Sequence, residues 1–70
     1  QVFNEVKDLV NYLSDEQREV VKMRYFSGMT FKEISEESGI SINTALGRMR
    51  YALINLRKLK EKYNINFVLQ

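Results

Sequence analysis

The stretch that decides the fold is residues 30–53, TFKEISEESGISINTALGRMRYAL. Thr30 and Glu33 predict a capping box at the start of a short helix, because each side chain can bond the backbone N–H of the other residue. Gly39 follows after about two turns, and glycine tolerates the left-handed conformation that closes a helix. Ser41 is a candidate N-cap for the next helix. A short helix, a glycine turn and a longer helix in succession are typical of a helix-turn-helix.

The longer helix is expected to run from Ile42 to about Lys62. Its apolar residues fall on one face at about 100° per residue, and a stripe of this kind faces the core. The residues of the expected stripe are Ile42, Ala45, Met49, Ala52, Leu53, Leu56 and Tyr63. The opposite side begins with Asn43, Thr44, Gly47, Arg50 and Tyr51 and continues with Ile54, Asn55 and Lys58.

Two earlier helices are expected before residue 30. Helical spacing of apolar residues predicts the first, from about Val2 to Tyr12. The second begins at Ser14, which forms a capping-box pattern with Gln17, and it ends at Gly28. The second helix and the short third helix must pack together, so we expect an ion pair between Arg18 and Glu33. We also expect four aromatic side chains in the core: Tyr12, Tyr25, Phe26 and Phe31.

Composition excludes several classes of protein. Seventy residues allow one small domain, and a chain that starts at Gln1 is expected to be a fragment of a longer protein. Cysteine and histidine are both absent, which removes disulfides, thiolate metal sites and the commonest general base. We therefore expect no enzyme, metal, cofactor or small-molecule substrate. No apolar run approaches the roughly 20 residues of a membrane span, so no membrane contact is expected.

The charge is unevenly distributed along the chain. The net charge is only +2, but residues 1–40 hold eight acidic and five basic side chains, whereas residues 41–70 hold one acidic and six basic. A basic end joined to an acidic half indicates a polyanion partner for that end. A solvated basic helix face is the alternative interpretation.

The outward side of the long helix carries residue types that read DNA. The second helix of a helix-turn-helix enters the major groove with its N-terminal end, where asparagine can pair with adenine and arginine with guanine. Asn43 and Arg50 are therefore candidate base readers, and Thr44 with the first N–H groups of the helix can bind phosphate. Basic residues that can contact phosphate are Arg48, Arg57, Lys58 and Lys60, with an acidic partner as the alternative for Arg48.

Gly47 is unusual at an outward helix position. Glycine costs about 1 kcal/mol of helix propensity relative to alanine. Its presence is explained if a base edge or a sugar comes close to the helix, and a tolerated surface glycine is the alternative. The first helices also carry many aliphatic residues, which form either the core alone or a groove for a partner helix.

An ordered set of short motifs runs from Leu13 to Arg57. The motifs are Leu13-Ser14, Arg18-Glu19-Val20-Val21, Met23-Arg24-Tyr25, Gly28-Met29-Thr30-Phe31-Lys32-Glu33-Ile34-Ser35, Gly39-Ile40-Ser41-Ile42-Asn43-Thr44-Ala45, Arg48-Met49-Arg50-Tyr51-Ala52-Leu53 and Leu56-Arg57. This set resembles region 4 of bacterial RNA polymerase sigma factors, and most of all the extracytoplasmic-function branch of the sigma-70 family.

The resemblance implies a fold and a function. The implied fold is all-α, with three short helices and one long C-terminal helix. It is similar to a winged-helix DNA-binding domain without the wing, with residues 1–70 as one domain and the helix-turn-helix at about 30–60. The implied function is binding of the minus-35 promoter element by the C-terminal part of a sigma factor that directs transcription initiation. The implied partners are promoter DNA, the β flap of the polymerase core and an anti-sigma factor, in the bacterial cytoplasm at the nucleoid.

The resemblance also assigns residues by position. The base-reading face falls on Asn43, Thr44, Leu46, Gly47, Arg50 and Tyr51. The candidates for phosphate contact are Phe31, Lys32, Ser41, Arg48, Arg57 and Lys58. The candidates for docking of polymerase or an anti-sigma factor are Val2, Phe3, Val6, Leu9 and Val10.

The chain departs from relatives of this kind within the reading face. Relatives often carry a basic or polar residue where Leu46 stands and serine where Gly47 stands. Neither residue here can form a side-chain hydrogen bond, so base readout is expected to lean on Asn43, Arg50 and DNA shape. Two alternatives to a sigma factor stay open. One is the DNA-binding effector domain of LuxR-type response regulators, and the other is a helical adaptor that contacts only proteins.

Overall fold

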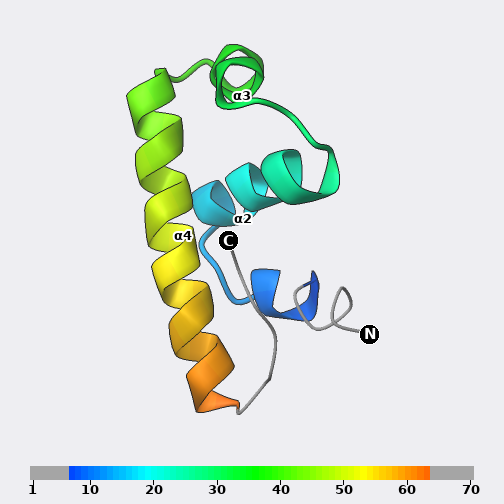
Figure 1. Cartoon of the computed structure of the whole chain (residues 1–70), viewed down its shortest axis with the longest axis vertical. Coiled ribbons are helices and arrows are strands. Elements are labelled where there is room, and N and C mark those ends of the chain that lie inside the picture. The colour runs from blue at the N-terminus through cyan, green and yellow to red at the C-terminus, as the bar shows by residue number, and fades with distance from the viewer. Residues whose placement is uncertain (1–6, 64–70) are drawn as a thin grey trace.

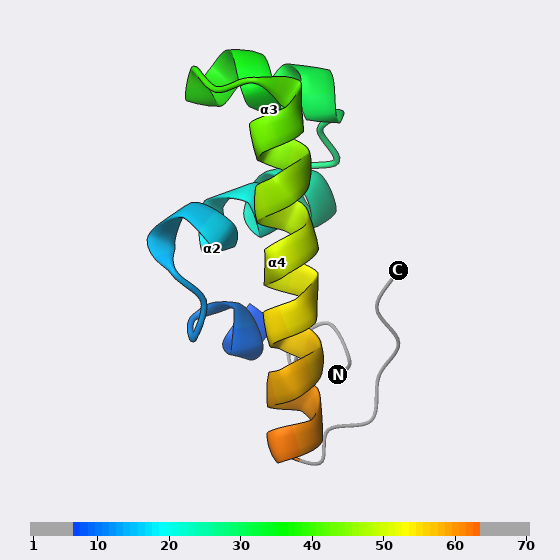
Figure 2. The same cartoon turned by 90° about the vertical axis from the view of Figure 1, so that its left-hand side faces the viewer.

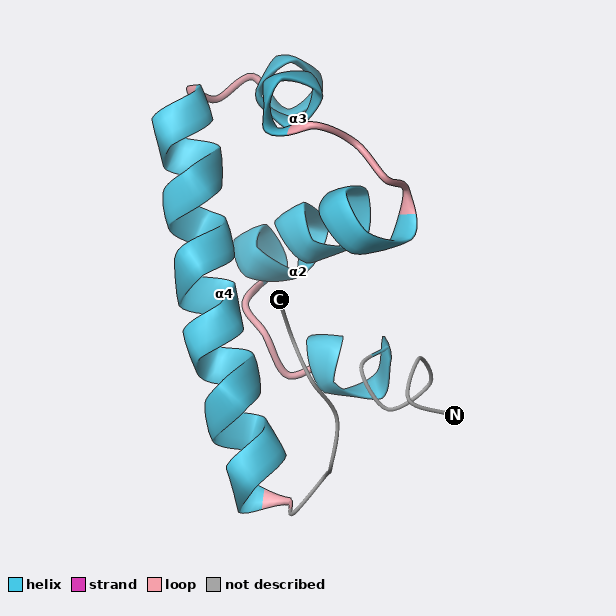
Figure 3. Cartoon of the chain, viewed as in Figure 1, coloured by secondary structure: helices cyan, strands magenta, loops and turns pink. Residues whose placement is uncertain are grey.

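The computed structural model describes residues 7–63, and within this range every regular element is helical (Figure 3). Residues 7–10 form a short helical stretch. They are followed by α2 (Asp15–Val21), which continues into a π-helical segment, η1 (Lys22–Phe26). The helix-turn-helix consists of α3 (Phe31–Ser38) and α4 (Ile42–Lys62). The all-α class and both ends of the long helix are thus confirmed.

The long helix α4 is the element on which the others pack. Figure 1 shows α2 lying against the middle of α4, with α3 at the N-terminal end of α4 and residues 7–10 nearer its C-terminal half. Figure 2, turned by 90°, shows the same arrangement, with α3 crossing the N-terminal end of α4. The N-terminal end of α4 is therefore flanked by α3, and α2 packs on the helix further along.

The core lies between α4 and the shorter helices. Its buried members are Leu9, Val10, Leu13, Val20, Val21, Ile34, Ala45, Met49, Ala52 and Leu56. Two residues of the expected stripe of α4 lie outside it, because Ile42 is 44% exposed and Tyr63 is 46% exposed. Ile42 is the first residue of α4 and Tyr63 caps its C-terminal end, so both lie away from the middle of the helix, where α2 packs. The Tyr63 ring instead packs against that of Tyr12, with 5.8 Å between the ring centres.

The caps form where the sequence predicts them. Thr30 and Glu33 form the reciprocal capping box, with bonds of 2.8 and 3.1 Å. The Ser41 hydroxyl accepts from the Thr44 N–H at 3.0 Å. Gly28 and Gly39 have φ values of +67° and +68°, which lie in the left-handed region that glycine favours. Short-range bonds therefore hold both sides of the turn between α3 and α4.

The N-cap of α2 is only half of the expected box. The Ser14 hydroxyl accepts from the Gln17 N–H at 3.3 Å, but the Gln17 side chain does not return to Ser14. Its Oε1 accepts from the Asn55 amide of α4 at 3.0 Å. Asn55 was expected on the outward side, so that placement was wrong. A long-range bond between α2 and α4 has replaced a local one.

The expected ion pair between Arg18 and Glu33 was wrong. Arg18 pairs with Asp15 within α2, and it also donates to the backbone oxygens of Asn11 and Leu13 at 3.5 Å. Glu33 is held at the start of α3 by its capping bond to Thr30. Both side chains found partners close in sequence, which left neither free to bridge the two helices.

The aromatic residues divide into two groups. Phe26 and Phe31 pack against the core, as expected. Tyr12 is 64% exposed and Tyr25 is 41% exposed, so their assignment to the core was wrong. The π-helical turn explains part of this result, because an extra residue in the turn rotates the side chains that follow it. No buried residue lies in η1.

Candidate nucleic-acid interface

The outward side of the N-terminal half of α4 brings the expected base-reading residues together. Ala45 and Met49 are buried against α2 and α3, which fixes the rotation of α4 about its axis. Residues on the other side of the same turns must then face away from the core. The exposed members of this reading face are Asn43, Thr44, Leu46, Arg50 and Tyr51, and Gly47 is half-buried among them.

The start of α4 is partly occupied by its own cap. Ser41 accepts from the Thr44 N–H and donates its hydroxyl proton to Thr44 Oγ1 at 2.9 Å. The Thr44 N–H is therefore engaged and is not a free donor for a phosphate. The Thr44 hydroxyl proton takes no part in these two bonds, so the side chain can still donate to an outside acceptor.

Gly47 has no explanation within the chain. A Cβ built on Gly47 meets no atom within 4 Å, so an alanine there would fit without a clash. The residue is helical, unlike Gly28 and Gly39, so its backbone does not require glycine either. The missing side chain leaves a flat spot on the reading face, which allows the surface of another molecule to approach the helix backbone closely.

The basic residues around the reading face differ in their freedom to contact phosphate. Lys32, Arg57 and Lys58 are exposed, and Phe31 beside Lys32 is half-buried. Arg48 already has an acidic partner, because its Nη2 lies 3.4 Å from Oε2 of Glu16 in α2. The sequence left two roles open for Arg48, contact with phosphate or pairing with an acidic residue, and in the structure Arg48 is paired with an acidic residue.

An acidic hollow borders the reading face on the Arg48 side. Its acidic lining residues come from α2, namely Asp15, Glu16 and Glu19. Arg18 and Arg48 line the same hollow, and each forms an ion pair with one of these carboxylates. The lining thus combines three acidic and two basic side chains, and two of the three carboxylates are paired.

Glu33 shows how firmly the start of α3 is held. The Thr30 backbone N–H, and after it the Thr30 hydroxyl, hold the pKa of Glu33 below its ordinary value of 4.5. Hydrogen bonds to the ionised form have this effect because they stabilise the carboxylate relative to the acid. The first turn of α3, which carries Phe31 and Lys32, is therefore anchored by an ionised cap at neutral pH.

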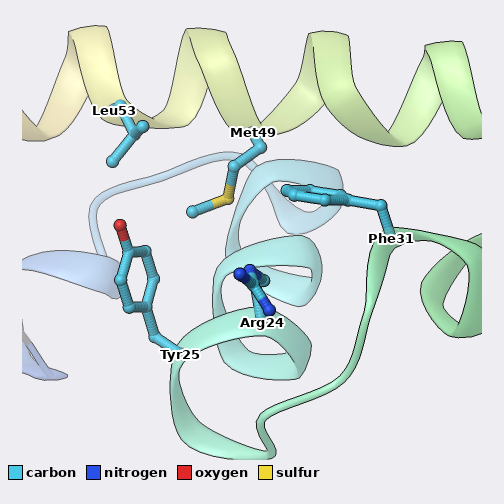
Figure 4. Close-up of a pocket in the computed structure, with 5 residues that line it drawn as sticks. All are labelled: Arg24, Tyr25, Phe31, Met49 and Leu53. Carbon is cyan, nitrogen blue, oxygen red and sulfur yellow. The ribbon is translucent and has the colours of Figure 1, made fainter. Parts of the chain in front are cut away.

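A pocket on the other side of α4 was missed by sequence reasoning. It is lined by Arg24, Tyr25, Phe31, Met49 and Leu53. Figure 4 shows the rings of Tyr25 and Phe31 on either side of Met49, with Arg24 between them. The Arg24 guanidinium lies 5.3 Å from the centre of the Phe31 ring and donates to the Met29 carbonyl at 3.0 Å. Arg24 and Tyr25 belong to η1, and nothing in the sequence pattern signals a π-helix.

Two of the five docking candidates on the first helix, Leu9 and Val10, lie within the described residues. Leu9 is 3% exposed and Val10 is 0% exposed, so both belong to the core and offer no surface to a partner. Burial of these residues stabilises the small domain. The other candidates of that set, Val2, Phe3 and Val6, lie outside the described residues.

Residues 7–63 lack the features of two other classes of site. No helix in this range is both long and apolar enough to cross a membrane. The same residues contain no group of three or more histidine, cysteine or acidic side chains that could hold a metal ion.

Comparisons with known proteins are consistent with this geometry. The family described as "Sigma-70, region 4" matches residues 3–53. The ECF RNA polymerase sigma factor SigK of Mycobacterium ulcerans (strain Agy99) is 35% identical over 52 residues, which cover 74% of this chain and 28% of that protein. SigK of Mycobacterium tuberculosis (strain ATCC 25618 / H37Rv) gives the same identity and coverage, and SigK of Mycobacterium sp. (strain KMS) differs only in that 27% of it is covered. The chain thus matches little more than a quarter of the length of these relatives.

Proposed function

Because this chain belongs to the sigma-70 region 4 family, we propose that it binds the minus-35 element of promoters as the DNA-reading part of a sigma factor. In this proposal α4 enters the major groove with its N-terminal end, and α3 lies against the DNA backbone. The whole protein would direct RNA polymerase to its promoters, with this domain contributing one of the promoter contacts.

One observation carries the proposal. Asn43 and Arg50 lie on the same exposed side of α4, in turns whose opposite side is buried by Ala45 and Met49. Side chains on a helix that is fixed in this way are held in register for contact with base edges. Arginine paired with guanine and asparagine with adenine each discriminate by about 1–3 kcal/mol.

The surroundings support the same orientation. Lys32 at the start of α3, and Arg57 and Lys58 further along α4, are exposed basic residues that can contact phosphate on either side of the groove. Arg48 lines the hollow next to α2 and is paired with Glu16, so we centre the DNA on Arg50 and not on Arg48. In this orientation the turn between α3 and α4 lies at the edge of the groove.

The test is a comparison of DNA selection by two variants. Duplexes with a randomised centre are selected with the 70-residue chain, and binding of the selected duplex is followed by fluorescence anisotropy over a range of salt concentrations. We expect log affinity to fall with log salt at a slope of about −0.9 per phosphate contacted. Arg50→Ala should relax the preference at one or two base pairs, whereas Lys7→Ala, exposed and remote in sequence, should change little.

Two results would contradict this assignment. If Arg50→Ala leaves both affinity and sequence preference unchanged, the reading face is wrong. If the chain selects no sequence and its binding does not depend on salt, a protein-only adaptor becomes the better interpretation.

We place the polymerase contact of this proposal at the pocket between η1 and α4. Tyr25 is 41% exposed there, and Phe31, Met49 and Leu53 give the pocket an apolar lining. A helical segment such as the β-flap tip can bury an apolar side chain in a groove of this kind. An anti-sigma factor that covers the same pocket would exclude the polymerase.

A labelled β-flap peptide titrated into the chain tests this contact. We expect saturable binding that Tyr25→Ala weakens and Tyr51→Ala leaves intact, because Tyr51 lies on the reading face. Equal effects of the two variants would contradict docking at this pocket. If the peptide does not bind even at high concentration, the proposed polymerase contact is wrong. The proposed DNA contact is tested separately by the duplex selection.

A further inference from the structure

Two aliphatic side chains stand exposed on α4 where a DNA-reading surface is expected to be polar. Leu46 is 42% exposed and Ile42 is 44% exposed. They are four residues apart on one helix, so their side chains are neighbours on its surface. A single exposed leucine needs no explanation. Leu46 belongs to the candidate reading face and has Ile42 beside it, and this aliphatic pair does call for one.

The position of Leu46 is defined by its polar neighbours. Arg50 follows it by one turn, and Asn43 precedes it by three residues, so both border Leu46 on the helix surface. Gly47, next to Leu46 in sequence, has open space where a Cβ would stand. A molecule that contacts Asn43 and Arg50 at the same time must therefore also contact Leu46.

The chemistry of the major groove limits what Leu46 can meet there. The base edges present hydrogen-bond donors and acceptors, and the one apolar group among them is the C5-methyl of thymine. A leucine placed against any other base edge would strip water from a polar group without replacing its hydrogen bond. Against thymine, the same side chain buries a methyl group and loses nothing.

We propose that Leu46, with Ile42 beside it, recognises the C5-methyl group of a thymine in the bound duplex. The preferred site then contains a thymine adjacent to the bases that Asn43 and Arg50 read. This inference rests on the proposed DNA binding and deepens it, because it names the base that the apolar part of the reading face selects. It also gives a role to Ile42, which was expected in the core but is exposed in the structure.

The test removes the methyl group from the DNA and the leucine from the protein. Duplexes with a randomised centre are selected with the 70-residue chain, and each thymine of the selected duplex is replaced in turn by deoxyuridine, which lacks only the C5-methyl. We expect affinity to fall about fourfold at one or two positions, which is the factor for one buried carbon group. Leu46→Ala should bring the ratio of thymine to uracil affinity at those positions close to one.

A matched variant and a complementary base sharpen the result. Ile54→Ala removes an aliphatic side chain two turns further along α4, and this variant should keep the preference for thymine. A cytosine placed at the sensitive position should bind more weakly, and 5-methylcytosine should recover part of the loss, because it restores the methyl group. Circular dichroism of each variant checks that the helices are retained.

Three results would overturn the proposal. A selected duplex in which uracil replaces every thymine without loss shows that no methyl group is read, while DNA binding itself stands. A thymine preference that survives Leu46→Ala assigns the methyl contact to another residue. Failure to select any sequence removes the proposed DNA reading and this inference with it.

Discussion

The two sides of α4 differ in what satisfies their side chains. Ala45, Ala52 and Leu56 are 0% exposed and pack against the other helices, whereas Tyr51 is 61% exposed and Arg50 beside it also faces outward. The inward side is therefore covered by other parts of the chain, whereas the outward side is open to solvent. Under the proposed function, stability depends on the inward side of α4 and DNA reading depends on its outward side. They should be separable by substitution.

The largest effect is expected at Leu56, which is fully buried. Leu56→Ala should lower the free energy of unfolding by about 2–5 kcal/mol, because it removes buried carbon groups and leaves a cavity. A domain of this size has only a few kcal/mol in total, so the variant should be largely unfolded. Urea denaturation followed by circular dichroism measures the change.

The neighbouring Arg57 is the matched control for Leu56. It is exposed, so Arg57→Ala should change the free energy of unfolding by less than about 0.5 kcal/mol. Comparable losses in the two variants would break the distinction between the sides of α4.

Gly47 should show opposite signs for stability and binding. Gly47→Ala should raise the free energy of unfolding by about 1 kcal/mol, since alanine is the better helix former and its Cβ meets no atom. The same Cβ should lower DNA affinity, because it fills the flat spot on the reading face. Urea denaturation and fluorescence anisotropy give the two quantities.

Gly39→Ala is the contrasting variant for Gly47. It should destabilise the protein by about 1–2 kcal/mol, because Gly39 has a φ of +68° that alanine adopts poorly. If Gly47→Ala stabilises the fold without weakening DNA binding, Gly47 is a tolerated surface residue.

A smaller effect is expected at the ion pair between Arg48 of α4 and Glu16 of α2. Glu16→Gln should change the free energy of unfolding by no more than about 1 kcal/mol, as for other exposed pairs. It should also free Arg48 for phosphate and steepen the salt slope of DNA binding by up to about 0.9. Anisotropy titrations over a range of salt concentrations measure the slope.

Lys58→Ala provides the opposite change, a salt slope flatter by about 0.9, because an exposed phosphate contact is removed. If Glu16→Gln leaves the salt slope unchanged, Arg48 is excluded from the DNA contacts. The same holds if Glu16→Gln steepens the slope and the double variant Glu16→Gln/Arg48→Ala keeps the steeper slope.

The smallest effect concerns the ionised cap of α3. The folded pKa of Glu33 lies below its ordinary value of 4.5, so its stabilisation is present above that value and is lost as the pH falls through the lowered pKa. Glu33→Gln keeps a capping acceptor but does not titrate. The free energy of unfolding should therefore fall less in Glu33→Gln than in the parent chain below pH 4.5. Parallel curves of stability against pH would contradict this role.

Features that depend on a few neighbouring residues could be predicted from the sequence. The capping box at Thr30, the N-cap at Ser41 and the left-handed Gly39 all form as expected. Their bonds join atoms three or four residues apart, so they need no knowledge of the rest of the chain. The helical period likewise separated the reading face of α4 from the core, and four of the seven expected stripe residues are buried.

Contacts between helices could not be predicted in the same way. Gln17 is bonded to Asn55 across 38 positions, and Arg18 pairs within α2 and not with Glu33. Each of these side chains had several partners within reach of its length, and the rotation of α2 against α4 selected one. The periodic pattern likewise gave no indication of the π-helical turn that exposes Tyr25.

The sequence by itself determined the caps of α3 and α4, both ends of α4 and its exposed side, because caps and periodicity act over one or two turns. Only the tertiary structure decided which charges pair, which ends of the long helix stay exposed and where an apolar pocket opens. Those outcomes depend on how far α4 extends beyond the helices packed on it and on which side chains meet across the core. The packing of α4 against the other helices depends on the whole chain, so no short stretch of the sequence predicts it.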